Sequence, residues 1–191
     1  MGNGEGGLLG QGKLETCHTP SKIRNLENVK IVTVESGAFN TLSLSKDGHL
    51  FSWGRGDGGQ LGIDVSVMKT RLASFGVDST DFICIAPEVI AFPDMNLKFI
   101  QIACGEAHCL ALTTTNQVYG WGANNNGQLG NGECADDHDP GSGTRLTTKC
   151  EPIQLTALSN KQIIRISAAG AFSSFITRNG EVLMCGNDNK G

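Results

Sequence analysis

The sequence lacks both a long apolar run and a concentration of positive charge. No stretch approaches the roughly 18 consecutive apolar residues that a membrane span needs. The 15 Lys and Arg residues are scattered along the chain and are outnumbered by 19 Asp and Glu residues, which gives a formal net charge of −4. Because binding to phosphates requires a concentrated Lys and Arg surface, the composition predicts neither a membrane nor a direct nucleic-acid partner.

Paired cysteines and catalytic motifs are missing as well. The seven cysteines form an odd set without a C-x-x-C pair, and no apolar leader segment is present. This pattern favours free thiols in a reducing compartment, cytoplasmic or nuclear. The sequence has no nucleophile elbow, HExxH motif, phosphate loop or helix-placed carboxylate pair. We therefore expect no enzyme, no metal and no cofactor.

Helical periodicity is absent, whereas glycine is abundant, with 26 residues, and one glycine-rich stretch recurs. It runs from Trp121 to Gly132, returns at Trp53, opens the chain with Met1 in place of Trp, and begins again at Cys185. Recurrence in the same order indicates a repeat architecture. We expect the shared positions to be structural anchors: Trp53, Gly54, Gly59, Gln60, Gly62, Trp121, Gly122, Gly127, Gln128 and Gly130.

The segments between the anchors share one internal order. Each begins with a proline, which suits a strand start or an edge: Pro20, Pro87 and Pro152. Alternating apolar runs follow and predict first strands at 30–35, 99–104 and 163–168. After a short turn and a second strand, tight junctions such as Asp47-Gly48 lead into third strands at 50–53, 118–121 and 182–185. Each unit is therefore predicted to be an antiparallel β-meander.

Two longer segments, 63–86 and 133–151, carry no pattern, and we expect them to be functional loops or mobile insertions. The second contains Cys134, His138 and Cys150. These residues are candidate metal ligands by type, but their spacing fits no standard zinc pattern. The second insertion is therefore expected to be a solvated loop without a metal.

Other residues of chemical interest have a structural interpretation. The G-x-G-x-x-G matches at 2–7 and 54–59 recur at one position of the repeat, and a meander does not supply the helix that a dinucleotide site needs. They are expected to be turns. Trp53 and Trp121 are expected to pack in the interior, and Cys104 and Cys109 are expected to be small core residues.

The combined pattern resembles the repeat of the regulator of chromosome condensation (RCC1) family. The resemblance rests on Trp-Gly, four residues, then Gly-Gln-Leu-Gly; on Pro with an aliphatic residue three positions later; and on the Gly-x-x-His turn before Leu-Ala-Leu at 105–112. It covers nearly the whole chain. In that family such repeats build seven-bladed propellers of four-stranded antiparallel blades. The resemblance implies an all-β fold, a partial β-propeller of about three of seven repeats.

We expect the chain to be one repeat domain over residues 1–191. Its predicted divisions are an end-of-repeat fragment at 1–12 and units at 13–62, 63–132 and 133–191, the last of them truncated. A blade is apolar on both faces, so an open stack exposes two blade faces and invites association. We therefore expect a piece of a longer chain, or closure through other chains.

The resemblance also suggests a surface. In family members that act on a small GTPase, acidic and His residues of the Gly-x-x-His turns line the face that engages the GTPase. Only the turn at 105–108 keeps both residue types, as Glu106 and His108, whereas Asn40 and Phe172 replace His elsewhere. The alternative is a structural His108 whose ring nitrogens bond the backbone of its own turn.

These observations predict a non-enzymatic module that binds a protein partner through its loops. The candidate contact residues are Glu106, His108, Arg55, Asp57, Asn124 and Asn125. The alternative is guanine-nucleotide exchange on a small Ran-like or Rab-like GTPase. Chromatin attachment is a third possibility that the acidic composition disfavours.

Overall fold

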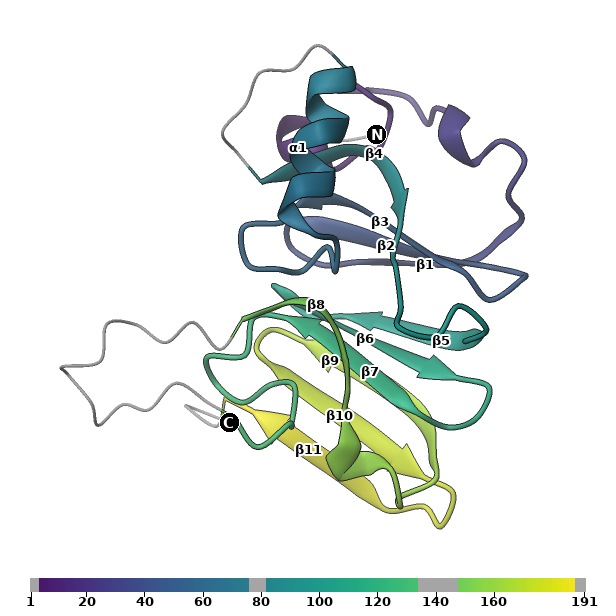
Figure 1. Ribbon diagram of the computed structural model, residues 1–191, viewed down its shortest axis with the longest axis vertical. Coiled ribbons are helices and arrows are strands. Elements are labelled where there is room, and N and C mark those ends of the chain that lie inside the picture. Colours follow the sequence, from purple (N-terminus) through teal and green to yellow (C-terminus); the bar gives the residue numbers. More distant parts are fainter. Residues whose placement is uncertain (1–3, 76–81, 134–147, 188–191) are drawn as a thin grey trace, which may run out of the picture.

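The protein folds into three antiparallel sheets that are stacked face to face (Figure 1). The structure is a computed structural model that describes residues 4–75, 82–133 and 148–187. The strand orders are β1-β2-β3-β4, β5-β6-β7-β8 and β11-β10-β9. The predicted fold class is confirmed: the chain is a nearly all-β partial propeller.

The strands follow the predicted meanders closely. The first sheet contains β1 Ile31–Ser36, β2 Asn40–Ser45, β3 Leu50–Arg55 and β4 Ile83–Val89. The second contains β5 Phe99–Cys104, β6 His108–Thr113, β7 Val118–Gly122 and β8 Lys149–Gln154. The third contains β9 Ile163–Ala169, β10 Phe172–Thr177 and β11 Val182–Gly186.

In the first two sheets, the fourth strand follows a long insertion in the sequence and then returns to pair with the third strand. After 63–82, β4 returns to pair with β3 in antiparallel register, with Ile83 opposite Arg55 and Val89 opposite Phe51. Pro87 lies in this edge strand, where a residue without an N–H group does not interrupt a ladder on its open side. In the same way β8 pairs with β7. The proline segments thus close the preceding sheet.

Apolar side chains fill the two seams between the sheets. In β6 every residue is buried, because alternate side chains enter opposite seams. Ala111 packs in the first seam with Leu42 and Leu44, whereas Leu110 packs in the second with Ile163. Burying a side chain of this size contributes about 1.5–3 kcal/mol, so the stacking of the sheets is the main source of stability.

The third sheet has an apolar far face. Four large hydrophobic side chains of this sheet are exposed: Ile164, Phe172, Val182 and Met184. At the other end of the stack, the first sheet contacts the 3-10 helix η1, Glu5–Gly7. Val32 and Val34 of β1 in the first sheet are also exposed. Exposed apolar side chains therefore occur on both outer sheets, as expected for an open stack.

The helix α1, Val65–Ser74, corrects the expectation that the chain lacks helices. Asp64 caps its first turn by accepting a hydrogen bond from the N–H of Ser66, at 2.7 Å. Met68 and Leu72, one helical turn apart, are buried, whereas Val67 is exposed. The short apolar stripe explains why the sequence pattern did not indicate this helix.

Two further 3-10 helices precede first strands: η2, Arg24–Leu26, and η3, Thr156–Leu158. No helix in the described ranges is both long enough and apolar enough to cross a bilayer.

Candidate functional site

Two kinds of loop meet at one end of the sheets. They are the turns between the first two strands, at 37–39, 105–107 and 170–171, and the anchor loops, at 56–62 and 123–132. Backbone hydrogen bonds join them: Arg55 donates to Phe39 at 2.7 Å, and Ala123 donates to Ala107 at 2.8 Å. We call this end of the sheets the turn face.

The three turns are tied to one another across the sheets. The N–H of Ala38 donates to the carbonyl of Glu106 at 3.3 Å, and the N–H of Glu106 donates to the carbonyl of Gly170 at 2.8 Å. Glu106 therefore occupies the middle of a continuous row of turns. The backbone fixes this row, while the Glu106 side chain is exposed.

The anchor residues explain the shape of the neighbouring loops. Gln60 accepts the N–H of Gly58 on its side-chain oxygen at 2.8 Å, and Gln128 accepts that of Asn126 at 2.9 Å. These bonds hold each loop in a tight bend. The glutamine in Gly-Gln-Leu-Gly thus has a structural role within its own loop.

The anchors also connect successive sheets through tryptophan. The indole Nε1 of Trp121 donates to the carbonyl of Gln60 at 3.0 Å, and the ring is fully buried. Gly62 has a φ of +66°, and a Cβ there would lie 2.8 Å from that Nε1. Only glycine meets both demands. Trp53 and Trp121 are both buried, which suits their expected role in packing.

The glycine motif at 54–59 ends β3 and continues into a turn instead of a helix. Gly59 approaches the backbone of β8 closely, since a Cβ there would lie 3.0 Å from the carbonyl oxygen of Lys149. Gly59 thus makes a packing contact between sheets, and the motif forms the turn that was expected of it. The matching motif at 2–7 lies partly outside the described residues.

His108 is fully buried, so the expectation of a surface histidine is wrong. Its Nε2 lies 2.9 Å from the hydroxyl of Ser173 in the next sheet, and that hydroxyl donates to the carbonyl of Gln128 at 2.7 Å. Because a carbonyl only accepts, His108 must donate to Ser173 from a protonated Nε2. The alternative expectation, a bond to the turn backbone, is also corrected. His108 joins two sheets.

Burial also sets the charge of His108. It lowers the pKa of the imidazole from 6.5 to about 4, because the charged form loses its hydration. The other ring nitrogen, Nδ1, is buried and has no hydrogen-bond partner among the described residues. The ring is therefore neutral at physiological pH.

The preceding unit has the same arrangement with a different residue. Asn40 occupies the position of His108, and its amide donates to Cys109 Sγ at 3.2 Å and to the carbonyl of Gln60 at 3.5 Å. The residue at this position therefore reaches from one sheet into the next. We call the pairs His108–Ser173 and Asn40–Cys109 the seam contacts.

Asn124 is fully buried as well, which corrects its expected exposure. Its side-chain oxygen accepts the N–H of Leu129, and its amide donates to Asn131 Oδ1 and to the carbonyl of Glu133, each at 2.9 Å. An asparagine that binds local backbone in this way stabilises a loop. Asn124 positions the loop that presents its neighbour Asn125.

The other four predicted contact residues are exposed on the turn face: Arg55, Asp57, Glu106 and Asn125. Arg55 and Asp57 form an ion pair at 3.0 Å. A Cβ on Gly58 would lie 3.6 Å from that of Ala107, so the first anchor loop rests against the second turn. Arg55, Asp57 and Glu106 are thereby brought together, and Asn125 lies in the next anchor loop.

Sequence reasoning missed two aromatic residues of this surface. Phe39 and Phe172 are each 41% exposed, and the guanidinium of Arg55 lies 5.2 Å from the centre of the Phe39 ring. In the sequence they stand out only as departures from the Gly-x-x-His pattern. Exposed aromatic residues in a turn are themselves a signal for a contact surface.

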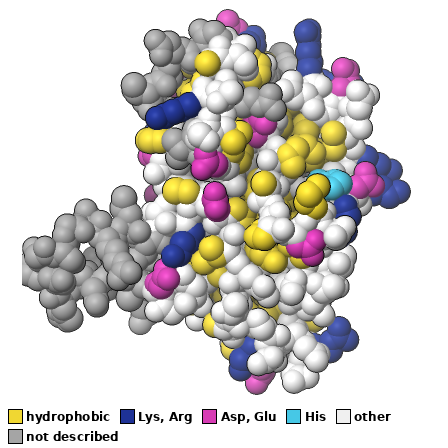
Figure 2. Space-filling view, in the orientation of Figure 1, with side chains coloured by type: hydrophobic (Ala, Val, Ile, Leu, Met, Phe, Trp, Pro, Cys, Tyr) yellow, Lys and Arg dark blue, Asp and Glu magenta, His cyan; other side chains and the backbone are white. Residues whose placement is uncertain are grey.

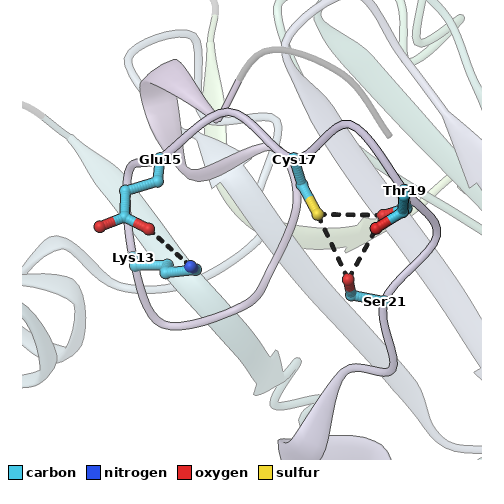
Figure 3. A network of polar contacts seen from close by, with 5 residues as sticks. All are labelled: Lys13, Glu15, Cys17, Thr19 and Ser21. Carbon is cyan, nitrogen blue, oxygen red and sulfur yellow. Dashed lines mark hydrogen bonds and ion pairs between the residues drawn. The ribbon is translucent and has the colours of Figure 1, made fainter.

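A separate polar cluster surrounds Cys17 (Figure 3). The sulfur lies 3.2 Å from the hydroxyl of Ser21 and 3.0 Å from the carbonyl of Thr19. The Ser21 hydroxyl stabilises the thiolate and so lowers the pKa of Cys17. Lys13 and Glu15 form an exposed ion pair beside it, at 2.6 Å.

The remaining cysteines do not assemble a metal site within the described ranges. Cys109 is fully buried in the first seam, and its hydrogen bond to Cys104, at 3.5 Å, together with burial raises the pKa of Cys104. Cys134 and His138 lie outside the described residues, and Cys150 is exposed on β8. No group of three or more metal-binding side chains occurs among the residues that the structure describes.

Comparisons with known proteins identify the repeat. A family model described as the regulator of chromosome condensation (RCC1) repeat matches residues 1–44, 47–112 and 115–176. A second model with the same description matches 31–60 and 99–128. These matches cover most of the chain.

Relatives of known sequence are much longer than this chain. The probable E3 ubiquitin-protein ligase HERC6 of Homo sapiens is 32% identical over 192 residues, which is 100% of this chain and 16% of that protein. The ultraviolet-B receptor UVR8 of Arabidopsis thaliana is 32% identical over 182 residues, 95% of this chain and 35% of the receptor. The chain thus spans about a third or less of these relatives.

The fold also matches a solved structure. Prp20p from Saccharomyces cerevisiae superposes with a TM-score of 0.74 and 22% identity, over 99% of this chain and 41% of that one. At that identity the likeness concerns the fold. With three stacked sheets, the repeated anchors and the family match, the chain belongs to the RCC1 repeat family.

Proposed function

We propose that this chain is a protein-binding segment of an RCC1-type propeller and that the turn face is its contact surface. The observation that carries the proposal is the continuous row of turns, in which Glu106 is bonded through its backbone to both neighbouring turns. A rigid row of loops on a stacked scaffold is a common setting for a binding surface.

The side chains of the turn face support a protein partner. Aromatic and Arg residues are enriched in interfaces, and here Arg55 lies against Phe39. Glu106 has no ion-pair or hydrogen-bond partner for its carboxylate among the described residues. This combination suits a partner that presents a basic side chain beside an apolar one.

The activities named for the relatives are not assigned to this chain. The ligase and the light receptor share only part of their length with this chain, so ubiquitin transfer and light reception remain descriptions of those proteins. What the shared part supports is a repeat scaffold, and the cytoplasm or the nucleus stays a proposal drawn from the composition.

Affinity capture with matched variants tests the proposal. The wild-type chain and two variants, Glu106→Arg and Glu181→Arg, are used as baits, and the captured proteins are compared by quantitative mass spectrometry. Both positions are exposed, but Glu181 lies next to β11 at the opposite end of the third sheet. We expect a partner that the wild type and Glu181→Arg retain and that Glu106→Arg loses. Equal capture by all three would refute the turn face.

Guanine-nucleotide exchange on a small Ran-like or Rab-like GTPase is the second candidate. The observation that favours it is the exposed acidic residue Glu106 in the middle turn. In addition, Prp20p, whose fold this chain shares, is described as binding Gsp1p and histones. Nucleotide release from a panel of GTPases tests this candidate. Acceleration by the chain that Glu106→Ala abolishes supports exchange, and unchanged release across the panel contradicts it.

A further inference from the structure

An apolar pocket opens at the end opposite the turn face, between the first and second sheets. Its volume is about 380 Å³, within the range of about 300–1,000 Å³ found for ligand pockets. Leu50, Ile90 and Phe99 are buried in its wall. Val89 and Met95 also line it and are 58% and 89% exposed. Figure 2 shows hydrophobic side chains gathered on the right of the view, beside a histidine.

One proline changes the turn in the connection that lines the pocket. In the connections that lead to β1 and β9, a 3-10 turn is closed when Leu26 donates to Ile23 at 3.2 Å and when Leu158 donates to Leu155 at 3.0 Å. The corresponding residue after Ile90 is Pro93, which has no N–H to donate. This connection instead turns later, where Leu97 donates to Asp94 at 3.2 Å.

The change of turn alters what fills the space below it. Leu158 of the third unit packs against the core of its seam, and leucine also stands at the matching position 26. In the second unit Pro93 is exposed instead. Phe92 and Leu97, partly buried like Leu158, pack against the core of the first seam, and both line the pocket. The pocket is therefore a feature of the 90–98 connection.

The rim of the pocket carries a cation without an acidic partner. Lys98 Nζ lies 3.1 Å from His49 Nε2, and because an ammonium group only donates, the imidazole accepts. No carboxylate pairs with Lys98 among the described residues. Asp94 also lines the pocket; its carboxylate accepts the N–H of Asn96 at 2.8 Å and forms no ion pair with Lys98. The positive charge of Lys98 is thus available to a ligand.

We propose that this pocket binds a bulky apolar side chain of a protein partner, in a segment that carries a carboxylate beside that side chain. The apolar walls take the side chain, and Lys98 pairs with the carboxylate. A protein segment suits the site better than a free small molecule, because Val89 and Met95 extend the apolar surface beyond the cavity. The site is independent of the turn face, which lies at the other end of the sheets.

Methyl NMR of the full chain, labelled at Ile and Met methyl groups, tests the proposal with the peptide acetyl-Glu-Trp-Glu-amide. We expect saturable shifts of the Ile90 and Met95 methyl signals. The peptide with Ala in place of Trp should give none, and the peptide with Gln in place of both Glu residues should bind at least about threefold more weakly.

Variants of the chain locate the binding. Ala91 lines the pocket and is exposed, so Ala91→Phe fills the space without disturbing the core. It should weaken peptide binding about tenfold or more. The matched control is Thr156→Phe, which places the same side chain at the corresponding exposed position after Leu155 and should leave binding unchanged. Amide spectra report whether each variant is folded.

Several outcomes would overturn the proposal. They are the absence of methyl shifts at millimolar peptide, and binding by Ala91→Phe equal to that of the wild type. Equal binding of the Glu and Gln peptides would refute the proposed pairing of Lys98 with a carboxylate. Binding of free N-acetyltryptophan as tightly as the peptide would refute the proposal that the ligand is a protein segment. The variant Glu106→Arg should bind the peptide normally, so failure of the pocket and failure of the turn face are distinguishable.

Discussion

His108 Nε2 and Ser173 Oγ lie 2.9 Å apart and join β6 of the second sheet to β10 of the third. The Ser173 hydroxyl in turn donates a hydrogen bond to the carbonyl of Gln128 in the anchor loop. A histidine that the sequence motif placed on a binding surface is thus part of the seam between two sheets. Its neighbour in the turn, Glu106, is the residue left for a partner.

The first prediction concerns this seam contact. Ser173→Ala removes the acceptor of the His108 N–H, and a buried donor without a partner costs about 1–3 kcal/mol. We expect the free energy of unfolding, measured by urea titration, to fall by that amount. Ser174→Ala, at the half-buried neighbouring position, should change it by less than about 0.5 kcal/mol. Equal effects of the two substitutions would contradict a specific role for Ser173.

The second prediction is a pH dependence of stability. The folded pKa of His108 is lowered from 6.5 to about 4, so the unfolded chain takes up the proton first as the pH falls. Protonation therefore favours unfolding: the contribution of His108 is constant above about pH 7 and is lost between 6.5 and 4, by up to about 3 kcal/mol.

The variant His108→Asn isolates this effect, because Asn occupies the equivalent position at Asn40. The difference in unfolding free energy between wild type and variant should shift in favour of the variant below pH 6.5. Other titrating groups contribute equally to both proteins and cancel. A difference that is independent of pH between 4 and 7 would show that His108 is not a buried neutral imidazole.

The third prediction separates backbone strain from packing against Trp121. Gly62 and Gly132 have φ values of +66° and +83°, but an added Cβ meets Trp121 Nε1 at 2.8 Å only in the first case and nothing within 4 Å in the second. We expect Gly132→Ala to cost about 1 kcal/mol and Gly62→Ala about 2–4 kcal/mol. Thermal or urea unfolding of both variants measures the difference, and similar costs would argue against the close contact.

The fourth prediction concerns the reactivity of Cys17. The Ser21 hydroxyl lowers the pKa of this thiol, so more thiolate is present at a given pH and alkylation is faster. Among the described cysteines, we expect Cys17 to react first with iodoacetamide, as followed by peptide mass spectrometry. Ser21→Ala should slow that reaction and move its pH profile upward, whereas the exposed Cys150 serves as an internal reference. Unchanged rates in Ser21→Ala would rule out the hydroxyl as the cause.

The strands were predictable because their side chains alternate. In β5 the predicted and observed limits coincide at Phe99 and Cys104, and the repeat of the pattern in three units supported the sheet assignment. The helix α1 was not predictable in this way, because its described side chains form a buried stripe of two residues, Met68 and Leu72. Two apolar residues at helical spacing can occur by chance in a polar segment, so they do not indicate a helix.

The contact surface was only partly predictable for a different reason. Whether the side chain of a turn residue is exposed or buried depends on the neighbouring sheet. For His108 that neighbour is Ser173, which lies 65 residues away in the sequence. The exposure of Glu106 and the burial of His108 are therefore decided by stacking and not by the local motif. Asn124 illustrates the same point, since its three hydrogen bonds form only after its loop has closed.

The return of β4 to β3 has a consequence for synthesis on the ribosome. The β3 strand ends at residue 55, but its partner is completed only when residues 83–89 have emerged. Until then the nascent chain displays an unpaired strand edge, the kind of surface that recruits chaperones and promotes misassembly. A sheet can therefore be completed only after the insertion that follows its third strand has been synthesised. A translational pause between residues 55 and 83 would prolong the time for which the edge of β3 is unpaired.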